Sequence, residues 1–238
     1  MYNELARFLV NEIDLYEKIT ILEGGCGFGQ LTIPLLKLIG KKIENFNYFA
    51  LDLSSGPYKN ASNALKEKLV KTKWMDKVEV VEGDVRSLNA IKDQFFSLII
   101  SNELFCDLER KGLEKALKEF YRVLKPNGQM CHCELISFPS NYAQELFIKA
   151  DSYSSEILTP EYVWFSPCAD EVVALMHKTR FKEFKIKYFD TNVSLTFTDA
   201  LEELKGWGLD EKFFMNYNAD LKKYGLEYPL THVILCRK

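Results

Sequence analysis

The sequence predicts a doubly wound α/β fold in which helices cover a mostly parallel, seven-stranded sheet. Short apolar segments alternate with segments of helical periodicity along most of the chain, an order typical of strand–helix units in one sheet. A glycine-rich stretch, ILEGGCGFGQLT (residues 21–32), continues the first of these apolar segments. The run FFSLIISN (95–102) is apolar almost throughout, as expected for a central parallel strand that is buried on both faces.

The composition favours one globular domain without a membrane span. The 238 residues are 47% hydrophobic and 27% charged, and the net charge is −3 with scattered Lys and Arg. This balance disfavours a broad nucleic-acid surface. No apolar run reaches the length of a membrane span. The N-terminal segment contains acidic residues among its apolar ones, a composition unlike that of a signal peptide. The six cysteines show no framework spacing, which suits the reducing cytoplasm.

The first strand–helix units surround the glycine-rich stretch. Apolar residues at three- and four-residue spacing predict a helix over 2–17, and a buried strand is expected over 19–22. A second helix is expected over 30–39, where Pro34 is tolerated in the first turn and Gly40 can end the helix.

The alternation continues through the middle of the chain. The expected elements are a strand over 47–53, a helix opened by Ser54, Ser55 and Pro57 that runs to about Val70, a strand over 77–84, a short helix near 87–94 and the strand of 95–102. A helix with an apolar stripe over 113–124 then ends at the turn KPNG, and a strand over 129–138 follows.

The last third of the chain fits the alternation less regularly. A helix is expected over 166–179, and strands over 181–190 and 230–238. We therefore expect a single domain, 1–238, with its core in about 18–137, 163–190 and 230–238 and with additions over the sheet at about 138–162 and 191–229.

The glycine spacing excludes two common nucleotide-binding loops. In open α/β sheets, ligands bind at the carboxyl ends of the strands, where the first loop leads into a helix. Glycines there let a ligand approach the main chain without a Cβ in the way. The stretch follows neither G-x-G-x-x-G nor the Walker pattern, and its spacing is Glu23-x-Gly25-x-Gly27-x-Gly29.

This spacing resembles motif I of the class I S-adenosylmethionine-dependent methyltransferases. Asp52 ends the second strand, where that family has an acid, and EGDVRSL resembles its third-strand motif. FSLIISNELFCDL and ALKEFYRVLKPNGQM resemble its fourth-strand motif and the helix and turn that follow. The resemblance covers residues 18–137 closely and 163–190 loosely.

The resemblance implies S-adenosylmethionine as methyl donor and a set of residues that bind it. Glu23 would complement the positive charge of the donor, Asp52 would bind the ribose hydroxyls, and Asp84 and the Val85 N–H would bind adenine. The expected donor-binding residues are Glu23, Gly25, Cys26, Gly27, Gly29, Gln30, Asp52, Leu53, Asp84, Val85 and Asn102.

Two acids at strand ends are the candidate catalytic residues. Glu103 follows the fourth strand and could act as general base, and Glu134 could help it or bind an acceptor amine. Glu103 could equally be an acid that favours the start of the next helix. The stretch Asn102–Phe105 departs from the Asp/Asn-Pro-Pro-Tyr/Phe pattern of the branch that methylates amides and bases, so that chemistry is disfavoured.

No metal site is expected at Cys131-His132-Cys133. Strand alternation places the two sulfurs on one face of the strand and the imidazole on the other, so they cannot converge on one ion.

The aromatic residues of the additions allow two interpretations. They are Phe138, Tyr142, Tyr153, Tyr162, Trp164, Phe165, Trp207, Phe213, Phe214 and Tyr217. They could form a lid over an acceptor pocket, or they could pack as a satellite core.

The function that these observations favour is O- or N-methylation of a small molecule by direct displacement. Positioning can supply most of the rate, because the methyl group is already activated by its positive leaving group. The alternatives are a protein or RNA methyltransferase and a non-catalytic subunit that binds the donor. A homodimer is one option for the assembly.

Overall fold

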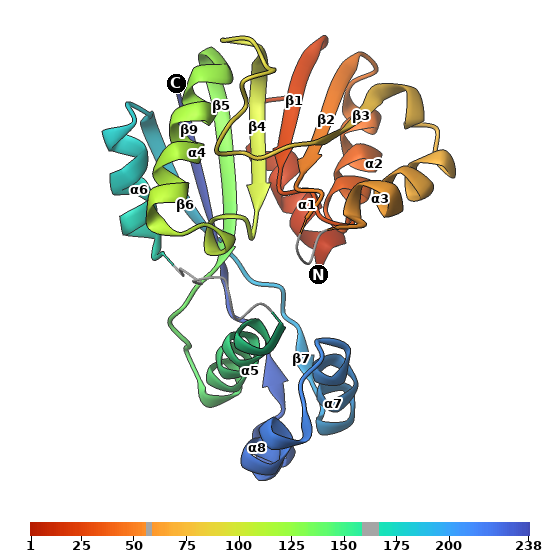
Figure 1. The fold of residues 1–238 in the computed structure, drawn as a ribbon, viewed down its shortest axis with the longest axis vertical. Coiled ribbons are helices and arrows are strands. Elements are labelled where there is room, and N and C mark those ends of the chain that lie inside the picture. The colour runs from red at the N-terminus through yellow and green to blue at the C-terminus, as the bar shows by residue number, and fades with distance from the viewer. Residues whose placement is uncertain (56–58, 159–166) are drawn as a thin grey trace.

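The computed structural model describes residues 1–55, 59–158 and 167–238, and it has the predicted architecture (Figure 1). Seven strands form one sheet in the order β3-β2-β1-β4-β5-β9-β6. All neighbours are parallel except β5–β9 and β9–β6, which are antiparallel. The strands are β1 (Ile19–Gly24), β2 (Phe46–Asp52), β3 (Val78–Glu82), β4 (Phe96–Asn102), β5 (Leu124–Leu135), β6 (Lys182–Phe189) and β9 (Thr231–Arg237).

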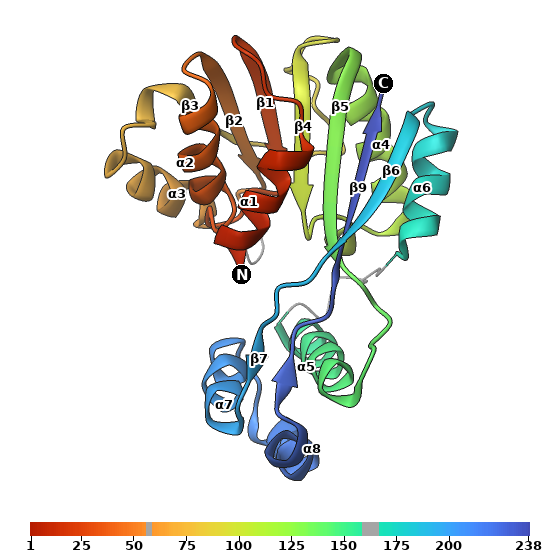
Figure 2. The same cartoon turned by 180° about the vertical axis from the view of Figure 1, so that it is seen from behind.

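Helices cover both faces of the sheet (Figures 1 and 2). The three helices of one face are α1 (Tyr2–Glu12), α2 (Thr32–Lys42) and α3 (Ala61–Val70), and those of the other are α4 (Arg110–Val123) and α6 (Ala169–Lys178). Each set encloses its own apolar core against the strands. Alternate side chains of β4 enter opposite cores, Leu98 and Ile100 one core and Ile99 the other, as the pleat of a fully buried strand requires.

The expected short helix near 87–94 is absent, and the segment forms turns instead. Its backbone groups bond to side chains of α4. The Leu88 N–H donates to Glu119 Oε2 at 2.7 Å, and the Arg122 guanidinium donates to the carbonyls of Leu88 and Ile91, each at 2.8 Å. These partners lie about 30 residues away in sequence, and no local periodicity could have indicated them.

Other boundaries also differ from expectation. The helix α1 ends at Glu12 rather than at residue 17. The helix α3 begins at Ala61, since Ser54 and Ser55 lie in a bend and Pro57 lies outside the described residues. The helix α2 runs through Gly40 to Lys42, and a Cβ on Gly40 would lie only 1.9 Å from the Trp74 ring. Gly40 therefore makes room for Trp74 rather than ending the helix. The turn KPNG lies inside β5, as an irregularity in its pairing with β4.

The two additions pack together into what we term the helical part: α5 (Tyr142–Leu158), α7 (Phe197–Gly206), α8 (Glu211–Tyr224) and the short strands β7 (Ser194–Leu195) and β8 (Leu226–Glu227). It lies beyond the carboxyl ends of the parallel strands (Figures 1 and 2). Its buried residues form a separate cluster, in which Phe147 contacts Trp207 and Tyr228 with ring centroids 5.1 and 4.4 Å apart.

The aromatic residues of the additions therefore pack largely among themselves. Tyr142, Tyr153, Trp207, Phe213, Phe214 and Tyr217 all belong to this cluster or contact it. Phe138 is 72% exposed, and Tyr162, Trp164 and Phe165 lie outside the described residues. These contacts favour the satellite-core interpretation for the residues that the structure describes.

In the described ranges, no helix is both long and apolar enough to cross a membrane.

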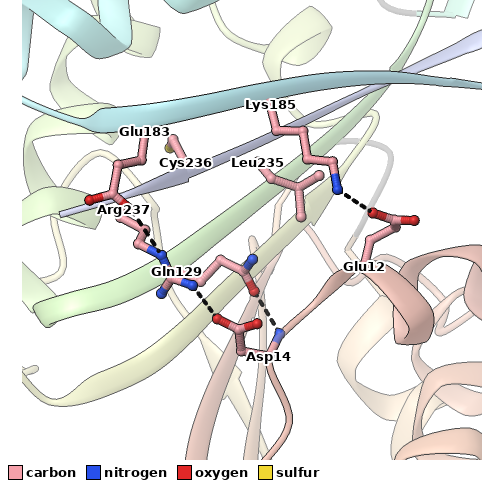
Figure 3. A pocket seen from close by; sticks show the side chains of 8 residues that line it. All are labelled: Glu12, Asp14, Gln129, Glu183, Lys185, Leu235, Cys236 and Arg237. Atoms are coloured by element: carbon pink, nitrogen blue, oxygen red, sulfur yellow. Dashed lines mark hydrogen bonds and ion pairs between the residues drawn. The ribbon is translucent and has the colours of Figure 1, made fainter.

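A polar pocket lies at the end of the sheet where the parallel strands begin, away from the helical part. Figure 3 shows the residues that line it. Gln129 pairs with Leu98, near the start of β4, and with Arg237, at the end of β9. The charged groups around the pocket are paired: Arg237 with Asp14 and with Glu183, and Lys185 with Glu12 at 3.2 Å. These contacts join the end of α1 to β6 and β9, and we assign the pocket a structural role.

Candidate active site

The glycine loop after β1 has a left-handed backbone conformation at three positions. Gly25, Gly27 and Gly29 have φ values of +74°, +50° and +81°, which glycine adopts far more readily than other residues. The N–H groups of Gly25 and Cys26 donate to the Leu51 carbonyl of β2 at 2.9 and 3.1 Å. The loop is thus fixed between the ends of β1 and β2.

Two of these glycines face protein and one faces open space. A Cβ on Gly25 would lie 2.9 Å from Leu104 Cδ1, and a Cβ on Gly29 would lie 2.5 Å from Leu65 Cδ1. Among the described residues, a Cβ on Gly27 would meet only Gln30 Oε1, at 3.7 Å. The bare backbone at Gly27 is therefore the part of the loop that a ligand could approach.

Asp52 lies at the end of β2, next to this open backbone. Its Oδ2 accepts a hydrogen bond from the Gly27 N–H at 2.5 Å, and its Oδ1 accepts one from the Leu53 N–H at 2.7 Å. Burial raises the pKa of Asp52, and the two backbone N–H groups partly offset that effect. The carboxylate keeps further lone pairs that can accept from a vicinal diol.

Glu23 is buried beneath the loop rather than exposed to a ligand. Its Oε2 accepts hydrogen bonds from Thr32 Oγ1 at 2.7 Å and from the Tyr48 hydroxyl at 2.9 Å. Burial raises its pKa to about 7. The contacts tie β1 to α2 and β2, so Glu23 positions the loop through its neighbours.

Asp84 lies after β3, and its carboxylate is already engaged. The Arg86 side chain and backbone N–H both bond to it, including an ion pair of 2.7 Å to Oδ2. Partial burial would raise the pKa of Asp84, but the hydrogen bonds and charge of Arg86 lower it overall. Val85 is buried, and its Cγ1 lies 3.3 Å from the position of a Cβ on Gly24. The expected adenine side of the site thus directly adjoins the glycine loop.

The end of β4 adjoins the loop on its other side. Gly24 of β1 is paired with Ser101 of β4, and Leu104 packs on Gly25. Asn102 Oδ1 is buried and has no hydrogen-bond partner in the structure as described. A buried acceptor of this kind needs an N–H donor, and a ligand in the loop could supply it.

Glu103 has an unusual backbone and an unusual charge environment. Its φ is +46°, a value that costs a non-glycine residue about 1–3 kcal/mol and that is often found at functional sites. Its N–H donates to the Cys133 carbonyl at 2.9 Å. Burial raises its pKa to about 8, helped by the charges of Glu134, Asp151 and Asp107. A carboxyl group with a pKa near the working pH is suited to general-base catalysis.

Glu134, at the end of β5, holds the next loop through one of its carboxylate oxygens. Its Oε2 accepts from the N–H groups of Phe105 and Cys106 at 3.1 and 3.3 Å, at the start of the 3₁₀ turn η3 (Phe105–Asp107). Burial raises its pKa to about 7. His132 Nε2 lies 3.5 Å away, and burial lowers the pKa of that imidazole to about 3, so it is neutral.

The Cys131-His132-Cys133 segment has the predicted alternation. The two cysteines enter the core under α1 and α2, whereas the His132 ring stacks on Phe105 with centroids 3.6 Å apart. The sulfurs and the imidazole therefore lie on opposite faces of β5.

Several residues near Glu103 had no sequence signal. Asp151 comes from α5 and is exposed. Partial desolvation of its carboxyl by nearby protein atoms, together with the charge of Glu134, raises its pKa to about 6. Burial, together with the charges of Glu103 and of Glu203 in α7, raises the pKa of Tyr2 in α1. The Tyr228 hydroxyl donates to Glu203 Oε1 at 2.8 Å. These positions meet only through the packing of the helical part and α1 against the sheet.

Comparisons with known proteins agree with this geometry. Residues 21–128 match a family model described as "Methyltransferase domain". The chain is 30% identical over 187 residues to the demethylmenaquinone methyltransferase of Staphylococcus carnosus, covering 71% of this chain and 70% of that protein. It is 27% identical over 202 residues to the malonyl-[acyl-carrier protein] O-methyltransferase of Priestia megaterium, covering 79% of this chain and 68% of that protein. The fold is similar to that of the YcgJ protein of Bacillus subtilis, with a TM-score of 0.73 at 13% identity over 99% of this chain and 98% of that one.

Proposed function

The chain belongs to the class I S-adenosylmethionine-dependent methyltransferase family, and we propose that it methylates a small-molecule acceptor at oxygen or nitrogen by direct displacement. The relatives named above are a malonyl-[acyl-carrier protein] O-methyltransferase and a demethylmenaquinone methyltransferase, and their names support methyl transfer to a small molecule. The observation that carries the proposal is Glu103, a carboxyl with a raised pKa at the end of β4, adjoining the glycine loop.

The donor-binding residues fit the donor. The open backbone at Gly27 leaves room for a ligand, Asp52 has lone pairs for the ribose hydroxyls, and the buried Asn102 Oδ1 is an acceptor for the donor ammonium. When bound, S-adenosylmethionine supplies a methyl group that is activated by a positive sulfur. The protein must then exclude water and align the acceptor, which is the contribution of positioning.

Glu103 is the general base in this proposal. A hydroxyl or amine must lose its proton as it takes the methyl group, and Glu103 accepts that proton. Its raised pKa makes it a stronger base than an ordinary carboxylate. Glu134 is a positioning residue, because its carboxylate fixes the backbone of Phe105 and Cys106 directly after Glu103.

Label transfer tests the proposal. The protein is incubated with donor carrying a deuterated methyl group and with a small-molecule extract, and mass spectrometry follows both the labelled product and S-adenosylhomocysteine. We expect the label in a small molecule, attached at oxygen or nitrogen. The Asp52→Ala variant should give less label because it binds the donor less well.

Other outcomes distinguish the rival functions. Label found only in protein or RNA, when those are supplied, would point to a macromolecular acceptor. Donor binding without turnover in any fraction would point to a non-catalytic subunit. Label on carbon would contradict the O- or N-methylation while leaving the small-molecule acceptor in place.

A further inference from the structure

Acidic groups from four elements gather at the end of β4. Glu103 follows β4, Asp107 lies in η3, Glu134 ends β5 and Asp151 comes from α5. Within the described part of the chain, neither Glu103 nor Asp151 forms an ion pair, and the only cation-forming side chain near Glu134 is the neutral His132. Glu103, Glu134 and Asp151 therefore lack a counter-charge from the described residues.

The glycine loop directly adjoins these acids. The register of β1 and β4 pairs Gly24 with Ser101, two residues before Glu103. Leu104, the residue after Glu103, touches Gly25. Between them, Asn102 Oδ1 is buried without a partner. Neighbouring strands lie about 4.8 Å apart, so a ligand against Gly27 lies within about 10 Å of Glu103.

We infer that binding of the sulfonium donor drives a proton off Glu103, so that donor binding itself prepares the base. This inference rests on the proposed function, since it concerns the same base. It assigns to the donor the counter-charge that Glu103 lacks.

The electrostatics support this coupling. Without donor, burial and the neighbouring acids hold the pKa of Glu103 at about 8, so most molecules carry a proton there at pH 7. A positive charge within about 10 Å favours the ionised carboxylate. The nearby Cys106, Cys133, Tyr2 and Tyr228 have raised pKa values and stay neutral. Glu134 and Asp151 share the same field and strengthen the effect.

The charges balance over one turnover. Ionised Glu103 takes the proton from the acceptor as the acceptor gains the methyl group, and the electron pair of the broken carbon–sulfur bond stays on sulfur. One positive charge and one negative charge disappear together. The neutral Glu103 then matches the neutral S-adenosylhomocysteine, and the next donor expels the proton to solvent.

Calorimetry of the isolated protein, without acceptor, tests the inference. Donor binding is measured at pH 7 in buffers of different ionisation enthalpy, which gives the number of protons released. We expect about half a proton or more per donor bound, and donor affinity rising about tenfold between pH 6 and pH 8. S-adenosylhomocysteine is the control ligand, since it lacks only the methyl group and the positive charge. Its binding should release clearly fewer protons, and its affinity should depend less on pH.

The Glu103→Gln variant tests whether Glu103 is the source of the released proton. It should bind S-adenosylhomocysteine as the wild type does, which shows that the site is intact. The difference in proton release between the two ligands should become clearly smaller, since only Glu134 and Asp151 can still respond to the charge of the donor. Glu114→Gln, which changes a surface acid of α4 paired with Lys178, should keep that difference. Equal proton release for both ligands in the wild type, or an unchanged difference in Glu103→Gln, would overturn the inference. Absence of donor binding would instead contradict the proposed function.

Discussion

Gly27 and Gly29 share a left-handed backbone but differ in what lies beside them. Both carry a positive φ, so both lose about 1–2 kcal/mol on replacement by alanine. Among the described residues, a Cβ added to Gly29 would lie 2.5 Å from Leu65 Cδ1, whereas a Cβ added to Gly27 would come no closer than 3.7 Å to Gln30 Oε1. The same loop thus separates a position kept open for a ligand from one needed for packing.

We expect Gly27→Ala to lower donor affinity by tenfold or more while the melting temperature falls by only a few degrees. Gly29→Ala should lose about 1–3 kcal/mol more stability, because the added methyl group overpacks against Leu65. Calorimetric titration and thermal unfolding of both variants check this. Equal loss of affinity and stability in the two variants would contradict the distinction.

Asp52 supports both the loop and the ligand. We expect Asp52→Ala to weaken donor binding at least about tenfold, on the order of 1.4 kcal/mol, because the ribose hydroxyls lose a charged acceptor. Asp76→Ala, at an exposed position in the 3₁₀ turn before β3, is the control and should bind normally. Unchanged affinity in Asp52→Ala would exclude the ribose role.

At the scale of elements, the turn η3 depends on a side chain from another strand. Glu134 accepts from two N–H groups at its start. Glu134→Ala leaves both N–H groups without that acceptor and should lower the free energy of unfolding by about 1–3 kcal/mol. Glu134→Gln retains one acceptor oxygen and should lose less. Urea unfolding compares the two variants, and equal stability would show that the contact is unimportant.

The sequence predicted most elements because their signals are local. Apolar runs located all seven strands of the main sheet to within a few residues, apart from the early start of β5. The segment 87–94 was mistaken for a helix because its partners, Glu119 and Arg122, are distant in the sequence. Gly40 was mistaken for a helix end because its partner Trp74 is also non-local.

The site was predictable in part for the same reason. The glycine spacing and the strand-end acids are local patterns, and the structure brings Gly27, Asp52 and Leu53 together. The packing of Glu23 against Tyr48 and the approach of Asp151 and Tyr2 to Glu103 depend on tertiary structure. No spacing in the chain encodes those contacts.

At the scale of the whole molecule, the buried acids and histidines set the pH dependence of stability. Folding raises the pKa of Glu23 and Glu134 to about 7 and of Glu103 to about 8. The stabilisation from such an acid is complete below its unfolded pKa of about 4.5 and is lost progressively as the pH rises from there through 7–8. His132 and His232, whose pKa values burial lowers to about 3, act oppositely, but only below their unfolded value of about 6.5.

We therefore expect the free energy of unfolding without ligand to fall by about 1–3 kcal/mol between pH 6.5 and pH 8. Urea titrations at several pH values measure this change. The Glu103→Gln variant should show a shallower fall. Stability that rises over this interval would contradict the burial of these acids.

The position of β9 in the sheet has a consequence for how the protein is made. The strand β6 contacts the rest of the sheet only through β9, and β9 comprises residues 231–237. During translation, β6 must therefore wait with an unpaired edge until those residues leave the ribosome, and cells that lack chaperones able to shield such an edge should accumulate more of this protein in aggregates.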